Sequence, residues 1–253
     1  LTAANVTSLY NEVQCVPAII PSDYFNPLLY TGNGSTQSID DLTFAPDFVW
    51  IKPRSQADNH NLFDTIRGVQ KQLISNNTSA ESTQPNTLTS FNSNGFSIGP
   101  DNNINTSAQT YVAWNWKAAA TTTTIAANTV GNTIASDVRA STESGFSIVS
   151  YTGNNVAGAT IGHGLGAAPD MIILKNRDTT DNWTVQTSDL TYTDYIDLNS
   201  INAATTNSSV WYAAPTSTVF SFGANPRGNG SGNDIIAYCF ASIPGMSDIG
   251  SYV

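Results

Sequence analysis

The pattern of apolar and polar positions predicts β-strands along most of the chain. Residues 48–51 and 171–174 are short continuous apolar runs, and each follows a Pro-Asp pair. Such runs are typical of strands that are buried on both faces. Residues 111–116 and 235–240 place bulky, β-branched or aromatic residues at alternate positions, which also indicates strands.

Glycine-rich turn signals separate the predicted strands. Gly-Asn-Gly occurs at residues 32–34 and again at residues 228–230, and each occurrence predicts a tight turn. Several short strands between such turns favour an antiparallel sandwich or jelly roll. The predicted fold class is therefore all-β, with β-sandwich (jelly-roll-like) lobes.

Several motifs occur twice in the same order, which predicts a tandem duplication. Tyr-Thr-Gly-Asn at residues 30–33 recurs at residues 151–154, an offset of 121 residues. The Ala-Pro-Asp run that starts at Ala45 recurs at Ala168, an offset of 123 residues, and two later matches have an offset of 124. We therefore expect two tandem, related β-sandwich lobes.

These offsets set the expected boundaries. Residues 22–117 form repeat 1, and residues 144–253 form repeat 2. Residues 118–143 are small, polar and poor in aromatic residues, so they are either a linker or a pair of strands that crosses between the lobes. Residues 1–21 are expected to be a linker or the end of a preceding domain, with a short helix capped by Thr2.

The composition narrows the classes of partner. Only 11% of the residues are charged whereas 40% are hydrophobic, so the chain has enough apolar material for cores. Nine Lys and Arg residues are scattered, and the net charge is −10. Because a nucleic-acid surface needs clustered positive charge, no nucleic-acid partner is expected. No apolar stretch approaches the length of a membrane span, so no membrane insertion is expected.

Two cysteines, Cys15 and Cys239, lie near opposite ends of the sequence. A disulfide between them remains open, although the sequence favours free thiols. The cysteines and histidines lack the spacing of a metal site, so we expect neither a metal nor a cofactor.

Carboxylate pairs are the first requirement for a glycoside hydrolase. The sequence has three glutamates, and none is close to another. The closest aspartate pairs are Asp40 with Asp41 and Asp194 with Asp197. Turn formation and solubility explain these aspartates better than catalysis does.

Neither histidine indicates a nucleophilic site. His60 and His163 fall at non-equivalent positions of the two repeats, and the chain has no Gly-x-Ser-x-Gly elbow. We therefore interpret both as surface or packing residues and expect no enzyme.

The repeated Pro-Asp motif has two interpretations. Asp47 and Asp170 are followed in both repeats by Lys-x-Arg, at residues 52–54 and 175–177. These residues could form a repeated ligand site. The favoured interpretation is a turn whose aspartate accepts from backbone amides or pairs with basic residues.

Aromatic residues in polar surroundings are the candidates for a sugar-contacting surface. The four candidate ligand-binding residues are Trp183, Tyr192, Tyr195 and Trp211. Core packing is an equal alternative for each of them. Three further tryptophans lie in strand patterns and are expected in a core or interface: Trp50, Trp114 and Trp116.

The repeated motifs resemble an uncharacterised duplicated domain of phage virion and tail-fibre proteins, especially from marine and other environmental phages. The resemblance covers roughly residues 22–253 and is carried by motifs in both repeats. The main ones lie at residues 30–34, 46–52, 62–68, 88–96, 111–117, 162–166, 169–170, 197–199 and 237–240. Residues 1–11 are similar to the closing segment of a concanavalin-like or laminin-G-like domain, which implies another β-sandwich before residue 1.

The resemblance implies a place on the virion surface and gives no catalytic residues. We expect a non-enzymatic virion structural protein, in a tail fibre or another surface appendage, with an adhesive role. The expected partners are other virion proteins, further copies of the chain in a homo-oligomer such as a trimer, and a host cell-surface glycan. The alternatives are a virion-associated polysaccharide-degrading enzyme and a capsid decoration protein.

Overall fold

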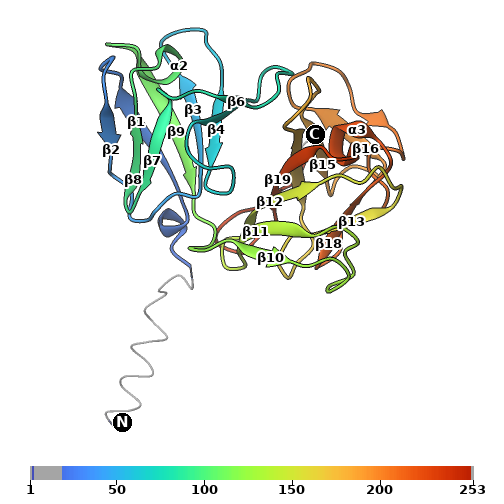
Figure 1. The fold of residues 1–253 in the computed structure, drawn as a ribbon. Coiled ribbons are helices and arrows are strands. Elements are labelled where there is room, and N and C mark those ends of the chain that lie inside the picture. The colour runs from blue at the N-terminus through green and yellow to red at the C-terminus, as the bar shows by residue number, and fades with distance from the viewer. Residues whose placement is uncertain (1, 3–18, 252–253) are drawn as a thin grey trace.

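The computed structural model describes residue 2 and residues 19–251, and most of their regular structure is β-strand (Figure 1). Within these residues the helices are short: η1 (Pro21–Asp23), α2 (Asn102–Asn105) and α3 (Pro226–Asn229). The prediction of an all-β fold is confirmed. The helix expected after Thr2, the concanavalin-like segment and Cys15 lie outside the described residues.

The N-terminal half contains a six-stranded and a three-stranded antiparallel sheet. The six-stranded sheet has the spatial order β1 (Phe25–Thr31), β9 (Thr110–Trp116), β3 (Phe48–Pro53), β4 (Asn61–Asp64), β5 (Lys71–Ile74) and β6 (Ser82–Thr83). The three-stranded sheet has the order β2 (Gln37–Ile39), β8 (Gly95–Ile98) and β7 (Leu88–Asn92). A core that includes Val49, Ile51, Phe96 and Tyr111 holds the two sheets together.

The C-terminal half contains an eight-stranded and a two-stranded sheet. The eight-stranded sheet has the order β10 (Thr123–Ile125), β11 (Ser136–Ser141), β12 (Phe146–Thr152), β19 (Asp234–Phe240), β14 (Met171–Asn176), β15 (Thr184–Thr187), β16 (Asp194–Asp197) and β17 (Thr205–Thr206). The two-stranded sheet pairs β13 (Ala159–Gly162) with β18 (Val219–Phe222). A second core, which includes Ile161, Leu174, Trp211 and Phe222, lies between these sheets.

The large sheets of the two halves have matching strand orders. The order β1-β9-β3-β4-β5-β6 in one corresponds to β12-β19-β14-β15-β16-β17 in the other. The eight-stranded sheet is larger because β10 and β11 are added beside β12. Residues 118–143 therefore contain β10 and β11, which pair with each other and extend the sheet of the C-terminal half.

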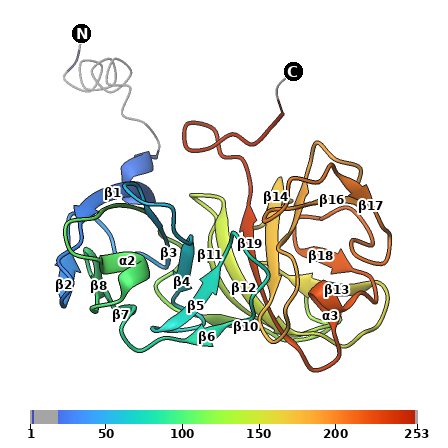
Figure 2. The ribbon, with the colours of Figure 1, turned by 90° about the horizontal axis from the view of Figure 1, so that it is seen from above.

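The two large sheets lie side by side in both views of the molecule (Figures 1 and 2). A third apolar cluster combines residues from both sheets, which include Phe48, Leu62, Phe146, Trp183 and Tyr238. Phe48 and Tyr238 are stacked across this boundary, with ring centroids 4.2 Å apart. The two halves therefore share a core.

The apolar run in β14 is buried on both faces, as its sequence predicted, since Ile172 and Leu174 lie in the core of the C-terminal half and Ile173 lies in the shared cluster. The alternating strand β19 is also buried on both faces. In β19, Ile235, Ala237 and Cys239 belong to the core of the C-terminal half. The alternate residues Ile236 and Tyr238 belong to the shared cluster. Side chains alternate between the two faces of a strand, so one strand contributes to two cores.

A buried charged network also joins the halves. Arg67 forms ion pairs with Asp64 and Glu81, and the hydroxyl of Tyr238 donates to Asp64 Oδ2 at 2.8 Å. Arg177 of the C-terminal half binds both oxygens of Glu81, at 3.0 Å each. Each charge thus has a partner, which offsets the cost of removing it from water.

The prediction of a tight turn at residues 228–230 is wrong, because residues 228 and 229 lie in α3. Asn225 caps this helical turn by accepting from Arg227 N, and Pro226 is at its first position. The buried Asn229 amide then donates to the carbonyl oxygen of Gly223 at 3.0 Å. In the N-terminal half, Asn105 of α2 makes the same bond to Gly99 at the same distance.

Candidate functional site

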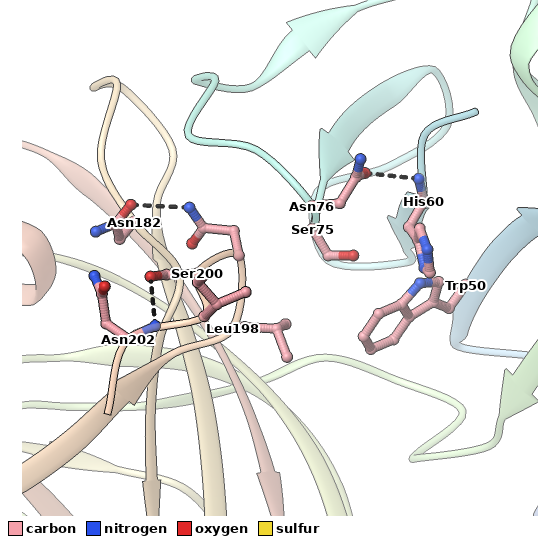
Figure 3. Close-up of a pocket in the computed structure, with 10 residues that line it drawn as sticks. Trp50, His60, Ser75, Asn76, Asn182, Leu198, Ser200 and Asn202 are labelled. Atoms are coloured by element: carbon pink, nitrogen blue, oxygen red, sulfur yellow. Dashed lines mark hydrogen bonds between the residues drawn. The ribbon is translucent and has the colours of Figure 1, made fainter. Parts of the chain in front are cut away.

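An open groove of about 730 Å³ lies between the two halves (Figure 3). We call it the central groove. Its lining residues are Trp50, His60, Ser75, Asn76, Asn182, Leu198, Asn199, Ser200, Ile201 and Asn202. In Figure 3 the labelled residues of the N-terminal half face those of the C-terminal half across the opening.

The wall from the N-terminal half contains an aromatic pair and an amide. Trp50 of β3 and His60 meet edge to face, with ring centroids 6.3 Å apart. Burial and the nearby charge of Lys52 lower the pKa of His60, so its imidazole is neutral at neutral pH. Asn76 accepts from the backbone N–H of His60 at 2.9 Å, which fixes the position of its amide oxygen.

The opposite wall holds two linked asparagine amides. Asn199 Nδ2 donates to Asn182 Oδ1 at 2.9 Å, and Asn182 Nδ2 donates to Asp197 Oδ2 at 2.8 Å. Asn199 Oδ1 accepts from the backbone N–H of Trp183 at 2.9 Å. These bonds fix the orientation of both amides before any ligand is present.

Apolar side chains lie beside the amides. Leu198 is 38% exposed, and Ile201 is fully exposed at 104%. Both line the central groove. Exposed apolar groups next to oriented polar groups are typical of small-molecule and sugar sites.

The lining contains no aspartate, glutamate, lysine or arginine. It offers amide donors and acceptors, hydroxyl groups, an aromatic face and a neutral imidazole. General acid–base catalysis needs a group that exchanges a proton near the working pH, and His60 is the titratable side chain in this lining.

The four predicted contact residues do not form one exposed surface. Trp183 is 0% exposed, Trp211 is 1% exposed and Tyr195 is 7% exposed, and only Tyr192, at 45%, is open to solvent. This corrects the expectation of an exposed aromatic face at these positions. Trp211 and Tyr195 lie in the core of the C-terminal half, where the other apolar side chains of that core cover their rings.

Trp183 packs in the shared cluster, where its Nε1–H donates to the carbonyl oxygen of Ile74 at 2.8 Å. This bond joins the two halves. The polar residues around Trp183 in the sequence had suggested exposure, but they belong to the groove wall and the loops. The indole itself points into the shared core.

Trp50, Trp114 and Trp116 are each half-buried. Trp50 and Trp116 pack against the shared cluster, as expected for core or interface residues. The place of Trp50 in the central groove was not predicted from sequence. The sequence did contain a signal for this position. Trp50 alternates with the buried Val49 and Ile51 in β3, so its side chain lies on the opposite face of the sheet from theirs.

The aspartate pairs are held in structural contacts. Asp197 pairs with Arg227 at 2.7 Å, and Asp194 accepts from the hydroxyl of Thr206 at 2.6 Å. Asp40 accepts from Asn92, and hydrogen bonds from Ser38 and Asn92 lower its pKa. None of these carboxylates lines the central groove.

The repeated Pro-Asp residues have the structural role that was favoured. Asp47 accepts from the backbone N–H of Ala118 at 2.7 Å and forms an ion pair with Arg139 at 2.6 Å. Asp170 accepts from the backbone N–H of Ser242 at 2.7 Å. Each aspartate therefore fixes the chain that leaves the last strand of its half.

The basic residues that follow the two Pro-Asp pairs differ in exposure. Arg54 is exposed, whereas Lys52 and Arg177 are partly buried. Lys175 is fully buried and donates to the carbonyl oxygens of Thr78, Thr179 and Asp181. Burial lowers the pKa of its amine to about 8. Because Thr78 belongs to the N-terminal half, this lysine also connects the halves.

His163 and Cys239 are both buried packing residues. Cys239 is a free thiol, and burial raises its pKa to about 12.

In the part of the chain that the structure describes, no group of three His, Cys, Asp or Glu residues could hold a metal ion. No helix within residues 19–251 is long and apolar enough to cross a membrane.

These features define a class: an all-β protein with sandwich-like sheets and an uncharged groove between its halves. The chain belongs to the family described as Domain of unknown function (DUF7483), whose model matches residues 20–253. No curated protein matches the chain, and no solved structure matches it.

Proposed function

We propose that this protein is a non-enzymatic structural component of a phage virion, placed in a tail fibre or another surface appendage, where it binds a host cell-surface glycan. The virion assignment is supported by the resemblance of the repeated motifs to phage virion proteins. The adhesive role is supported by the central groove, and that groove is the observation that carries the proposal.

The central groove has the components of a sugar site without those of a hydrolase. Trp50 and His60 supply an aromatic wall, and fixed asparagine amides supply hydrogen-bonding groups on both sides. Aromatic faces pack against the apolar faces of sugar rings, and amides bond to hydroxyl groups. A glycosidase would need two carboxyl groups across the same opening.

The proposal includes two tandem lobes that arose by duplication. The matching order of six strands supports it, and so do the equal bonds from Asn105 to Gly99 and from Asn229 to Gly223. The central groove then lies where related surfaces of the two lobes meet. Asn76 and Asn199 illustrate this, since both accept a backbone N–H and both donate to another asparagine.

The first test is competition for phage adsorption. The purified 253-residue chain is added to host cells before the phage, in its native oligomeric form, which we expect to be a homo-oligomer such as a trimer. The expected result is a concentration-dependent loss of adsorption. The double variant Ile201→Ser with Asn202→Ala should compete much less, because both side chains are exposed and line the central groove.

The matched control is Leu29→Ser, which removes an apolar side chain that is 65% exposed in β1 and lies outside the central groove. It should compete as well as the unchanged protein. Equal competition by the groove variant would place the contact elsewhere. Absence of competition by folded protein would contradict the adhesive role, and stable binding to assembled heads would then favour capsid decoration.

A further inference from the structure

We propose that the central groove selects a neutral oligosaccharide that carries acetamido groups. This inference rests on the proposed glycan-binding function and adds the chemical class of the sugar. Three features support this inference: the lining has no Asp, Glu, Lys or Arg, its asparagine amides are held in fixed orientations, and exposed apolar side chains lie beside them.

The charge disfavours an acidic sugar. An anion that enters the groove would lose hydration, and the lining offers no cation to replace it. Lys52 lies in an adjoining hollow that shares His60 and Asn76, but its amine already donates to the carbonyl oxygen of Asp58 at 3.0 Å. The net charge of −10 adds a general repulsion of polyanions.

The fixed amides favour a ligand with both donors and acceptors. An asparagine Nδ2 carries two N–H donors. Among the described residues, Asn76 and Asn199 each use one of these donors, for Asn59 at 3.2 Å and Asn182 at 2.9 Å. The second N–H of each amide is left for a ligand, in an orientation that the existing bonds already fix. An acetamido carbonyl oxygen is a strong neutral acceptor for such a group.

The apolar side chains favour a ligand with a methyl group. Leu198 and Ile201 are exposed and flank Asn199 and Ser200 in the same loop. A methyl group that contacts them removes apolar surface from water, which a hydroxyl group at the same place would not do. An acetamido group combines this methyl group with the carbonyl oxygen, and the sugar ring that bears it is left for Trp50.

The experiment compares two hexameric probes with the same β1,4-linked glucose backbone. Chitohexaose carries an acetamido group on each ring, and cellohexaose carries a hydroxyl group there. Isothermal titration calorimetry of the 253-residue chain should give a dissociation constant for chitohexaose that is lower than that for cellohexaose by about tenfold or more. Ile201→Ser and Asn202→Ala should each weaken chitohexaose binding, whereas Leu29→Ser should leave it unchanged.

A third probe, a hyaluronan oligosaccharide, carries acetamido groups together with carboxylates and should bind weakly. Equal affinity for hyaluronan would overturn the selection of neutral sugars. Equal affinity for cellohexaose, with loss of binding in Ile201→Ser, would overturn the acetamido preference and leave the glycan-binding function intact. If no probe binds the folded protein, the inference is overturned, and the adsorption competition still decides the adhesive role independently.

Discussion

Trp183 and Trp50 show how far the sequence predicts the exposure of a single tryptophan. Trp183 was a candidate for surface contact and is fully buried in the shared cluster. Trp50 was expected in a core or interface and also lines the central groove. Single residues in short strands are hard to assign, because their exposure depends on which sheet covers which face.

The buried indole of Trp183 should stabilise the fold and contribute nothing to binding directly. Trp183→Phe removes the hydrogen bond to Ile74 and leaves a cavity, so the free energy of unfolding should fall by about 1–3 kcal/mol. Urea denaturation measures this change. The exposed control Tyr192→Phe should change it by less than about 0.5 kcal/mol. An unchanged stability of Trp183→Phe would contradict the burial of this side chain.

His163 should make the stability depend on pH. Its Nε2 lies 3.1 Å from the carbonyl oxygen of Thr216, and its Nδ1 accepts from the backbone N–H of Leu165 at 3.3 Å. Burial lowers the pKa of His163 in the folded state, and a second ring proton would displace the Leu165 bond. The unfolded state therefore binds the proton more readily.

The sign follows from this difference. The stability that comes from keeping His163 neutral is fully present above its pKa in the unfolded state, about 6.5. This contribution is lost as the pH falls through the lower pKa of His163 in the folded state. His163→Gln cannot titrate, so its stability should fall less steeply below about pH 6.5. Urea denaturation of His163→Gln and of the unchanged protein across this range measures the slopes. Identical slopes for His163→Gln and the unchanged protein would contradict the prediction.

At the scale of elements, both strand patterns predicted strands. The apolar runs 48–51 and 171–174 lie within β3 and β14, and the alternating segments 111–116 and 235–240 lie within β9 and β19. Buried strands have a strong local signal because every position is apolar. The turn at residues 228–230 was misassigned because the Gly-Asn-Gly signal was read without the local cap Asn225 and Pro226, which begin the helical turn of α3.

The turns that follow β1 and β12 should both require glycine. A Cβ atom on Gly32 would lie 2.3 Å from the carbonyl oxygen of Thr106, and one on Gly153 would lie 2.4 Å from that of Gly230. Gly32→Ala and Gly153→Ala should each lower the free energy of unfolding by about 1–3 kcal/mol. Gly250→Ala, where the nearest contact is 4.0 Å away, is the control in thermal or urea denaturation. Normal stability in either variant would show that the backbone can move apart there.

At the scale of the whole molecule, the shared cluster makes the two halves dependent on each other. Phe48, Leu62, Phe146 and Tyr238 would be exposed if the halves separated. We therefore expect the full chain to unfold in one cooperative transition. The separate fragments 20–117 and 118–251 should aggregate or lack a cooperative transition. Two fragments that each unfold cooperatively in calorimetry would contradict this.

The charged network around Arg67, at the boundary between the two halves, should be needed for the stability of the fold. Arg67→Met leaves Asp64 without its buried charged partner, while Glu81 keeps Arg177, so stability should fall by about 3–5 kcal/mol. Arg54→Met, at an exposed position, is the matched control and should have little effect. A small loss in Arg67→Met, measured by urea denaturation, would show that the carboxylates find other partners or water.

The sequence by itself determined the all-β class and the buried strands. These features depend on local alternation and apolar runs, which are visible in the order of residues. For Asp47 and Asp170 the sequence favoured a structural role over a ligand site, but their partners Ala118 and Ser242 lie 71 and 72 positions away. The tertiary structure alone decided that the two halves share a core, that Trp183 is buried and that Trp50 joins the asparagines in the central groove. These features depend on contacts between residues more than a hundred positions apart, and no local pattern specifies which sheet faces meet.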